Sequence, residues 1–200
     1  MSDLAPIAEP FLRFQDLLDQ AKAVGAPALP EPTAFALGTV SEDGQPSVRI
    51  VLLKAVDERG FVFYTNHQSR KGTELLAHPK AAMCFHWQPL ERQVRVEGTT
   101  RAVSSEEADA YFASRARGSQ LGAWASLQSR PIATPGDLEA RVAEMEARFA
   151  GASVPRPPHW SGFRLVPQRI EFWHNMPSRL HRRDVYLREP VGWRQETLYP

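Results

Sequence analysis

Cations and hydroxyls gather at several points of this sequence where an apolar run begins or ends. The first group lies in residues 49–71, which start at Arg49 and close with Ser69-Arg70-Lys71 at the beginning of an expected helix. Fixed cations beside hydroxyls and free backbone N–H groups are suited to binding a phosphate. The alternative for this stretch is a hairpin whose charged ends are solvated.

A second group consists of Lys54, Tyr111, Arg115 and Ser119. The spacing of Tyr111 and Arg115 places a phenol and a guanidinium one turn apart on one face of an expected helix. A second phosphate site is one interpretation of this group, and a solvated helix end is the other.

A third group lies near the C-terminus, where alternation predicts that Arg179, His181 and Arg183 share one face of a strand. An exposed polar edge is the alternative there. The whole chain carries a net charge of only +1, so local clusters of cations favour a small anionic ligand over a nucleic acid. Tyr64, Trp124 and Trp173 could supply flat walls for an aromatic ring, although single aromatic residues more often belong to the core.

Motifs for several other kinds of chemistry are missing from the sequence. It contains no Gly-rich phosphate loop, no His-Glu-x-x-His metal motif and no Gly-x-Ser-x-Gly elbow, and we expect no metal site. The single cysteine, Cys84, excludes an intrachain disulfide and a Cys-based zinc cluster. The sequence contains no run of about 18 apolar residues, so it predicts no membrane-spanning helix. The first residues lack the pattern of a signal peptide, so we expect a cytoplasmic protein.

The elements that must position these groups follow from periodicity. After a flexible arm at residues 1–9, apolar residues at three- and four-residue spacing predict a helix over 11–24. Further helices are expected at 69–77, 104–114, 120–126 and from Pro135 to 150, and strands at 33–40, 46–56, 61–66, 81–87, 92–103, 163–174, 179–188 and 193–199. Short turns between the strands predict a mainly antiparallel β fold with helices (α+β), in one domain of residues 1–200.

The chain contains several motifs in a characteristic order. Because of these motifs it resembles the pyridoxine (pyridoxamine) 5′-phosphate oxidase family from about residue 11 to residue 200. Each motif is weak alone, but their joint order and spacing are specific. The motifs are Arg49-Ile-Val-Leu-Leu-Lys54, Phe63-Tyr-Thr-Asn66 with Ser69-Arg-Lys71, Glu91-Arg-Gln-Val94, Tyr111-Phe-x-x-Arg115, Ser119-Gln-Leu-Gly-Ala-Trp124, Gln128-Ser129, Ile170-Glu-Phe-Trp173 and Arg179-Leu-His181.

The resemblance implies a split β-barrel homodimer that binds FMN at the subunit interface, with residues 160–200 as the dimerisation and substrate-site region. It implies that FMN contacts residues from both subunits, namely Arg49, Val51, Leu52, Tyr64, Thr65, Arg70, Lys71, Gln93, Gln128, Ser129, Trp173 and Arg183. It assigns the substrate phosphate to Lys54, Tyr111, Arg115 and Ser119, and the catalytic and ring-facing roles to Arg179 and His181.

The reaction that the resemblance implies is oxidation of pyridoxamine or pyridoxine 5′-phosphate to pyridoxal 5′-phosphate, with hydride transfer to FMN. Dioxygen is the final acceptor and gives hydrogen peroxide, and the amine substrate also releases ammonia. The chain departs from the family pattern at Arg182, where an acid is common, and in its short N-terminal arm. One alternative is a related flavin oxidase acting on another aromatic substrate such as a phenazine precursor. The other is a non-catalytic protein that binds flavin or pyridoxal phosphate.

Overall fold

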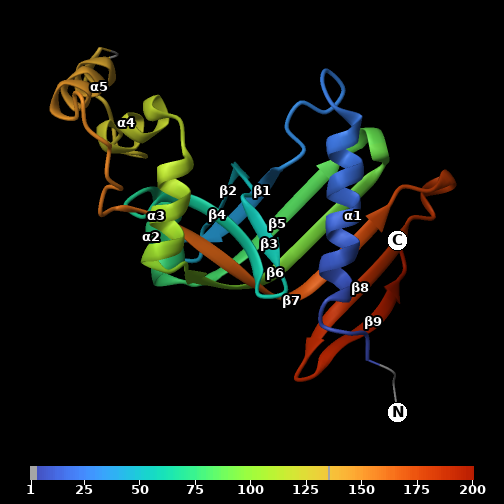
Figure 1. Cartoon of the computed structure of the whole chain (residues 1–200). Helices are drawn as coiled ribbons and strands as arrows, with labels where there is room; N and C mark the ends of the chain where they lie inside the picture. The colour runs from blue at the N-terminus through green and yellow to red at the C-terminus, as the bar shows by residue number, and fades with distance from the viewer. Residues whose placement is uncertain (1–3, 135) are drawn as a thin grey trace.

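A nine-stranded antiparallel sheet is the central element of the computed structural model, which describes residues 4–134 and 136–200 (Figure 1). The strands are β1 (Ala34–Val40), β2 (Pro46–Leu52), β3 (Ala55–Asp57), β4 (Gly60–Asn66), β5 (Lys80–Trp87), β6 (Arg92–Ala102), β7 (Trp160–His174), β8 (Arg182–Glu189) and β9 (Gly192–Leu198). The helices are α1 (Glu9–Val24), α2 (Arg70–Ala77), α3 (Ser105–Ser114), α4 (Arg117–Ala125) and α5 (Asp137–Arg148), with 3-10 turns at Gln88–Leu90 and Pro177–Arg179. The mainly antiparallel β fold with helices is therefore confirmed.

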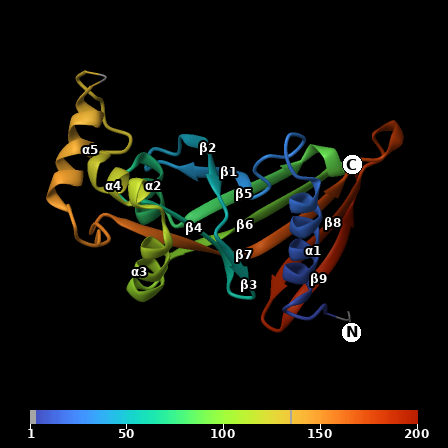
Figure 2. The ribbon, with the colours of Figure 1, turned by 45° about the horizontal axis from the view of Figure 1, so that its top comes forward.

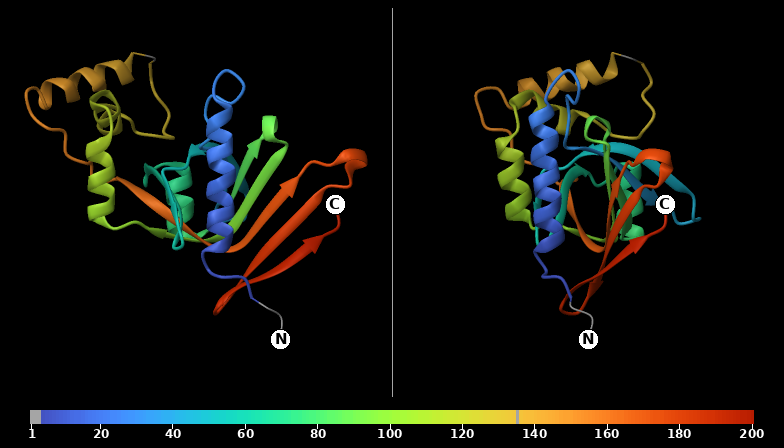
Figure 3. Two further views of the ribbon diagram at one scale, coloured as in Figure 1. Left: turned by 45° about the vertical axis from the view of Figure 1, so that its right-hand side comes forward. Right: turned by 90° about the vertical axis from the view of Figure 1, so that its right-hand side faces the viewer.

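The strand order is β2-β1-β5-β6-β7-β4-β3, and β8 and β9 continue from β7. One edge of β7 pairs with β6, while its other edge pairs first with β4 and then, from Arg169 to His174, with β8. Because β7 changes partner along one edge, the sheet divides, and β8 and β9 project away from β3 and β4 (Figure 3). Strands from both halves of the chain thus belong to one sheet.

Aromatic side chains fill the core between α1 and the sheet. Phe14 of α1 is fully buried, and its ring centroid lies 4.9 Å from the ring centroids of both Phe61 and Phe85. Buried and exposed positions alternate along β1 and β5, as expected for strands with one face on the core. Each such buried aromatic contributes about 1.5–3 kcal/mol relative to an exposed one.

The N-terminal arm is hydrogen-bonded to β9 from Ala5 onward, and the flexibility of residues 1–9 stays a prediction. The backbone of Ala5 forms two hydrogen bonds with Trp193, of 2.8 and 2.9 Å, and the Trp193 indole donates to the carbonyl of Ile7 at 3.0 Å. A buried indole N–H needs an acceptor, and the arm supplies it. Residues 1–3 lie outside the described residues.

Most predicted elements are present with shifted ends. The helix expected at 120–126 begins earlier, at Arg117, and the helix expected to start at Pro135 is α5, with Pro135 itself outside the described residues. The strand expected at 46–56 is two strands, since Leu53 and Lys54 separate β2 from β3.

A smaller apolar cluster holds α3, α4 and α5 together at the end of the molecule opposite α1 (Figure 2). Its buried members include Phe112, Leu121, Met145 and Phe149, and Trp160 joins it to the start of β7. Among the helices of the described residues, none has the length and apolar character that a membrane span requires. The cytoplasmic location remains a prediction.

Candidate functional site

A cavity of about 520 Å³ opens between β2, β4, the start of α2 and the helices α3 and α4. Ten residues assigned to cofactor or substrate from the sequence line it, together with Ile50, Asn66, Ala116 and Trp160. The ten are Val51, Leu52, Lys54, Tyr64, Thr65, Lys71, Tyr111, Arg115, Ser119 and Gln128. The fold therefore brings the second predicted cluster and Lys71 of the first into one cavity.

Lys54 reaches the cavity because the chain turns a corner between β2 and β3. The N–H of Leu53 donates to the carbonyl of Thr33 at 2.9 Å, whereas the next N–H, that of Lys54, donates to the carbonyl of Val62 at 2.9 Å. The backbone thus leaves its pairing beside β1 and joins β4 within one residue. Leu53 is buried at the corner, and Lys54 lines the cavity.

Three stacked aromatic rings form one wall of the cavity. The ring of Tyr64 lies 4.0 Å from Tyr111 and 5.4 Å from Trp160, with interplanar angles of 18° and 7°. Gly162 pairs with Tyr64 across β7 and β4, and a Cβ there would lie 2.8 Å from the Tyr64 ring. Burial, with the nearby Glu107 carboxylate, raises the pKa of Tyr64 to about 12, so its phenol keeps its proton at neutral pH.

Arg115 extends over this aromatic wall with part of its hydrogen-bonding capacity unused. Its guanidinium carbon lies 4.7 Å from the centre of the Trp160 ring, and its Nη1 is buried with no hydrogen-bond partner among the described residues. Burial lowers the pKa of this guanidinium, which nevertheless stays charged at neutral pH. A buried cationic donor without an acceptor is costly, so the site is suited to an anion.

Lys71 enters the same cavity from the first turn of α2. Its Nζ donates to the hydroxyls of Thr65 at 3.2 Å and of Ser69 at 3.3 Å, and Ser69 also caps the helix by accepting from the N–H of Gly72. Burial lowers the pKa of Lys71, and the charge of Arg49 lowers it further. A cation at a helix N-terminus, beside hydroxyls, has the composition of a phosphate site.

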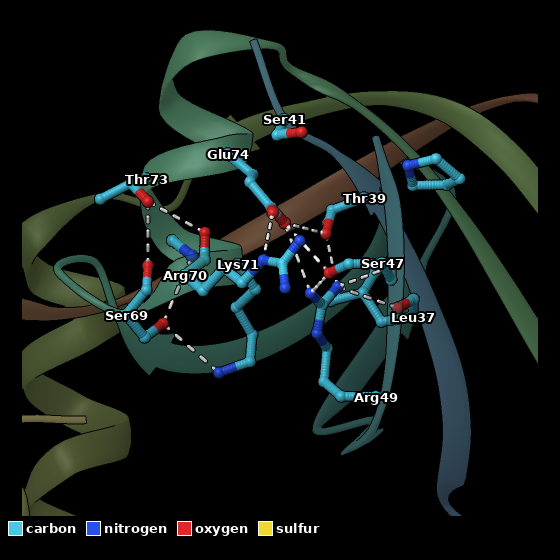
Figure 4. Close-up of polar contacts among 12 residues, drawn as sticks. Leu37, Thr39, Ser41, Ser47, Arg49, Ser69, Arg70, Lys71, Thr73 and Glu74 are labelled. Carbon is cyan, nitrogen blue, oxygen red and sulfur yellow. Dashed lines mark hydrogen bonds and ion pairs between the residues drawn. The ribbon is translucent and has the colours of Figure 1, made fainter. Parts of the chain in front are cut away.

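The structure places Arg49 and Arg70 next to Lys71 but pairs both with a carboxylate that the sequence analysis missed. Arg49 Nη2 lies 3.3 Å from Glu74, and Arg70 Nε donates to Glu74 at 2.9 Å (Figure 4). Neither arginine lines the cavity. The Arg70–Glu74 spacing of four residues on one helix was the signal available in the sequence.

A second set of predicted cofactor residues lies away from the cavity, across β6, β7 and β8. Gln93 pairs with Trp173, and Trp173 pairs with Arg183 in the strand register. Arg183 donates to the buried carboxylate of Glu171 at 2.9 and 3.2 Å. Ser129 also does not line the cavity and has a φ of 71°. One chain therefore supplies two separate sets of predicted cofactor residues.

The expectation that Arg179, His181 and Arg183 share one strand face is wrong, because β8 begins only at Arg182. Ser178 and Arg179 lie in a 3-10 turn that begins at Pro177, and their φ values are 58° and 61°. Backbone with these φ values is not extended and cannot pair as a strand. The ring of His181 lies 4.7 Å from that of Trp173. His181 is thus close to the second set, through tertiary contact rather than strand alternation.

Two other residues singled out in the sequence have local partners. Arg182, at the position where an acid was expected, forms an ion pair of 3.0 Å with Asp184. Trp124 does not line the cavity; its indole donates to the carbonyl of Pro155 at 2.7 Å, and its ring packs on Phe149.

Comparison with known proteins gives consistent matches along the whole chain. Residues 22–174 match the family model described as pyridoxamine 5′-phosphate oxidase, and residues 160–200 match the pyridoxine 5′-phosphate oxidase C-terminal dimerisation region. The chain is 64% identical to the pyridoxine/pyridoxamine 5′-phosphate oxidase of Myxococcus xanthus strain DK1622, over 96% of this chain and 92% of that protein. It is 56% identical to the protein of the same name from Rhodospirillum rubrum, over 96% of both.

Solved structures confirm the split-barrel fold. PhzG from Burkholderia lata 383, solved in complex with tetrahydrophenazine-1-carboxylic acid, superposes with a TM-score of 0.88 at 32% identity, over 96% of this chain and 92% of that one. A pyridoxamine 5′-phosphate oxidase-related, FMN-binding protein from Nostoc punctiforme superposes with a TM-score of 0.73 at 18% identity, over 94% and 95% of the two chains. The second match bears on the fold alone.

Proposed function

The chain belongs to the pyridoxamine 5′-phosphate oxidase family, and from this premise we propose that it oxidises pyridoxamine or pyridoxine 5′-phosphate to pyridoxal 5′-phosphate with FMN as cofactor. The observation that carries the proposal is the cavity that both Lys71 and Arg115 line. Two cations that reach one cavity from different elements, α2 and the segment between α3 and α4, suit two phosphorylated ligands, and both FMN and the substrate carry a phosphate.

The residues around Lys71 are chemically suited to the FMN phosphate. The hydroxyls of Thr65 and Ser69, the first turn of α2 and the cation supply donors to an anion. We assign the FMN phosphate to Arg49, Arg70 and Lys71, and the flavin ring to the adjoining wall of Val51, Leu52, Tyr64 and Thr65 together with Gln128 and Ser129.

The remaining FMN residues support a homodimer with the cofactor at the subunit interface. Gln93, Trp173 and Arg183 lie on β6, β7 and β8, outside the cavity of their own chain. A partner subunit can supply such a set, and residues 160–200 match a dimerisation region. We therefore propose that each cofactor site combines the cavity of one subunit with the second set of the other.

The substrate phosphate is assigned to Lys54, Tyr111, Arg115 and Ser119. The unused Nη1 of Arg115 provides a donor that needs an anionic acceptor, which supports this assignment. The stacked rings of Tyr64 and Tyr111 form the adjoining wall.

Bound FMN would supply the hydride acceptor, and dioxygen would then take up the electrons as hydrogen peroxide. The chain itself orients the substrate by its phosphate, and this positioning is the main task of a protein that serves a redox cofactor. We assign Arg179 and His181 to the substrate ring and its reacting substituent. His181 accepts a hydrogen bond from the N–H of Met176 at 3.3 Å on Nδ1, which leaves Nε2 to face the substrate as a donor.

The test is an aerobic assay of the purified protein with pyridoxamine and pyridoxine 5′-phosphates, after its visible spectrum is recorded. A flavin spectrum with formation of aldehyde and peroxide supports the proposal. A flavin spectrum without turnover of either substrate would favour a different aromatic substrate, such as the non-phosphorylated acid bound by PhzG, or a non-catalytic binding protein. Absence of FMN binding would refute the cofactor assignment.

A further inference from the structure

We propose that Glu74 is a positioning residue for the cofactor phosphate, acting through Arg49 and Arg70; this inference rests on the proposed function. Glu74 lies on α2, its side chain is only 6% exposed, and it does not line the cavity. It lies between the two arginines that the sequence assigns to the FMN phosphate (Figure 4).

The carboxylate of Glu74 is saturated with donors from three elements. Oε1 accepts from Arg70 Nε at 2.9 Å, and Oε2 accepts from the hydroxyl of Thr39 at 2.5 Å and lies 3.3 Å from Arg49 Nη2. Burial opposes the ionisation of Glu74, but the hydrogen bonds from Thr39 and Arg70 and the charge of Arg49 hold its pKa below the ordinary value. The group is therefore a fixed anion at neutral pH.

The network determines which arginine N–H groups remain for a ligand. Arg49 uses Nη1 and Nη2 on Glu74, Thr39, Ser47 and the carbonyl of Leu37, which leaves its Nε. Arg70 uses only Nε, so its two terminal nitrogens have no partner among the described residues. Because the Arg70 side chain is 57% exposed, its bond to Glu74 is the contact that orders it.

The charges also match the proposed ligand. The cations of Arg49, Arg70 and Lys71, less the one carboxylate of Glu74, leave two positive charges. A phosphate monoester carries roughly 1.5 to 2 negative charges at neutral pH. Two roles for Glu74 then predict opposite effects of its removal. If Glu74 positions the arginines, its loss weakens phosphate binding. If Glu74 only neutralises part of their charge, its loss strengthens phosphate binding.

The test compares FMN with riboflavin, which has the same ring and no phosphate, in titrations of the full-length apoprotein followed by flavin fluorescence. For Glu74→Gln we expect FMN binding to weaken about tenfold, as is typical when a group that orients the ligands of a site is lost, with riboflavin binding unchanged. Glu42→Gln is the matched control. It removes an exposed negative charge near Arg70 without removing a hydrogen bond to it, and should not weaken FMN binding.

Glu74 also joins α2 to β1, so the variant loses stability, and a second variant separates folding from positioning. Thr39→Val keeps the Glu74 charge and removes the hydroxyl that donates to Glu74 and accepts from Arg49; we expect FMN binding to weaken about threefold to fivefold, again without an effect on riboflavin. Equal losses for FMN and riboflavin, or tighter FMN binding in Glu74→Gln, would overturn the inference and leave the proposed function standing. If the unmodified protein does not bind FMN, both fail.

Discussion

Replacement of Arg115 by methionine separates the two phosphate sites. The Arg115 guanidinium lies over Trp160 at 4.7 Å, lines the same cavity as Lys71, and has a buried Nη1 without a partner in the described part of the chain. If this cation binds the substrate phosphate, its loss removes a charge-assisted interaction of about 2–3 kcal/mol. That free energy corresponds to a KM for pyridoxine 5′-phosphate about 30- to 150-fold higher.

The same substitution should leave the folded protein intact. Methionine retains an apolar stem over Trp160 and removes a buried unsatisfied donor, whose cost is about 1–3 kcal/mol. The lost cation–π contact is worth only about 0.5–1 kcal/mol. We therefore expect the substrate-free variant to melt at the temperature of the parent protein or a few degrees above it.

The assays are steady-state kinetics, FMN titration and thermal melting, with Arg101→Met as the control. Arg101 is an exposed arginine at the end of β6, outside the cavity. A loss of FMN affinity equal to the loss for substrate would show that Arg115 belongs to the cofactor site. A melting temperature clearly below that of the parent protein would show that Arg115 Nη1 has a structural partner. That result would refute the inference that this nitrogen is an unsatisfied donor in the substrate-free protein.

Three further outcomes are expected. Replacing both Arg70 and Lys71 by glutamine should yield protein that purifies largely colourless, and a fully yellow preparation would contradict the phosphate assignment. Gly72→Ala should destabilise the fold by about 1–3 kcal/mol in chemical denaturation, because a Cβ there would lie 2.5 and 2.6 Å from backbone oxygens of the preceding turn. Burial opposes the ionisation of Glu171, but hydrogen bonds from Arg183 and a neighbouring arginine lower its pKa. Its stabilising contribution is therefore complete above the unfolded value of about 4.5 and lost as the pH falls through the lower folded pKa. Glu171→Gln should accordingly destabilise the protein at pH 7 much more than at pH 3, and an equal loss at both would contradict this.

Local patterns in the sequence were sufficient to predict most of the helices and strands and the chemical character of the cavity. Alternation and turn residues predict β1 and β5, because inward-facing and outward-facing positions repeat with the period of the strand itself, whereas β4 is an apolar run buried along most of its length. The spacing of Tyr111 and Arg115 likewise predicts neighbours on a helix end, and both line the cavity. The ordered motifs were sufficient to identify the family, which the comparisons confirm.

Periodicity could not predict where the backbone changes partner. The segment 46–56 is extended and mainly apolar apart from Ser47, Arg49 and Lys54, yet its N–H groups turn from β1 toward β4 at Lys54, a choice that depends on the tertiary arrangement of those strands. The positive φ values of Ser178 and Arg179 likewise keep this segment out of the strand that alternation predicted, and β8 begins only at Arg182. The direction of the Lys54 and Arg179 side chains was therefore decided by the fold.

The sequence by itself determined the family, the antiparallel β architecture and the cationic residue types that can bind phosphate. Only the tertiary structure decided how those cations are partnered. Glu74 on α2 meets Arg49 and Thr39, which lie on β2 and β1, and Gln93, Trp173 and Arg183 align across β6, β7 and β8 although they are separated in the chain. Such contacts depend on strand order and register, which arise from burial of the whole core and are not encoded in the spacing of the residues that meet.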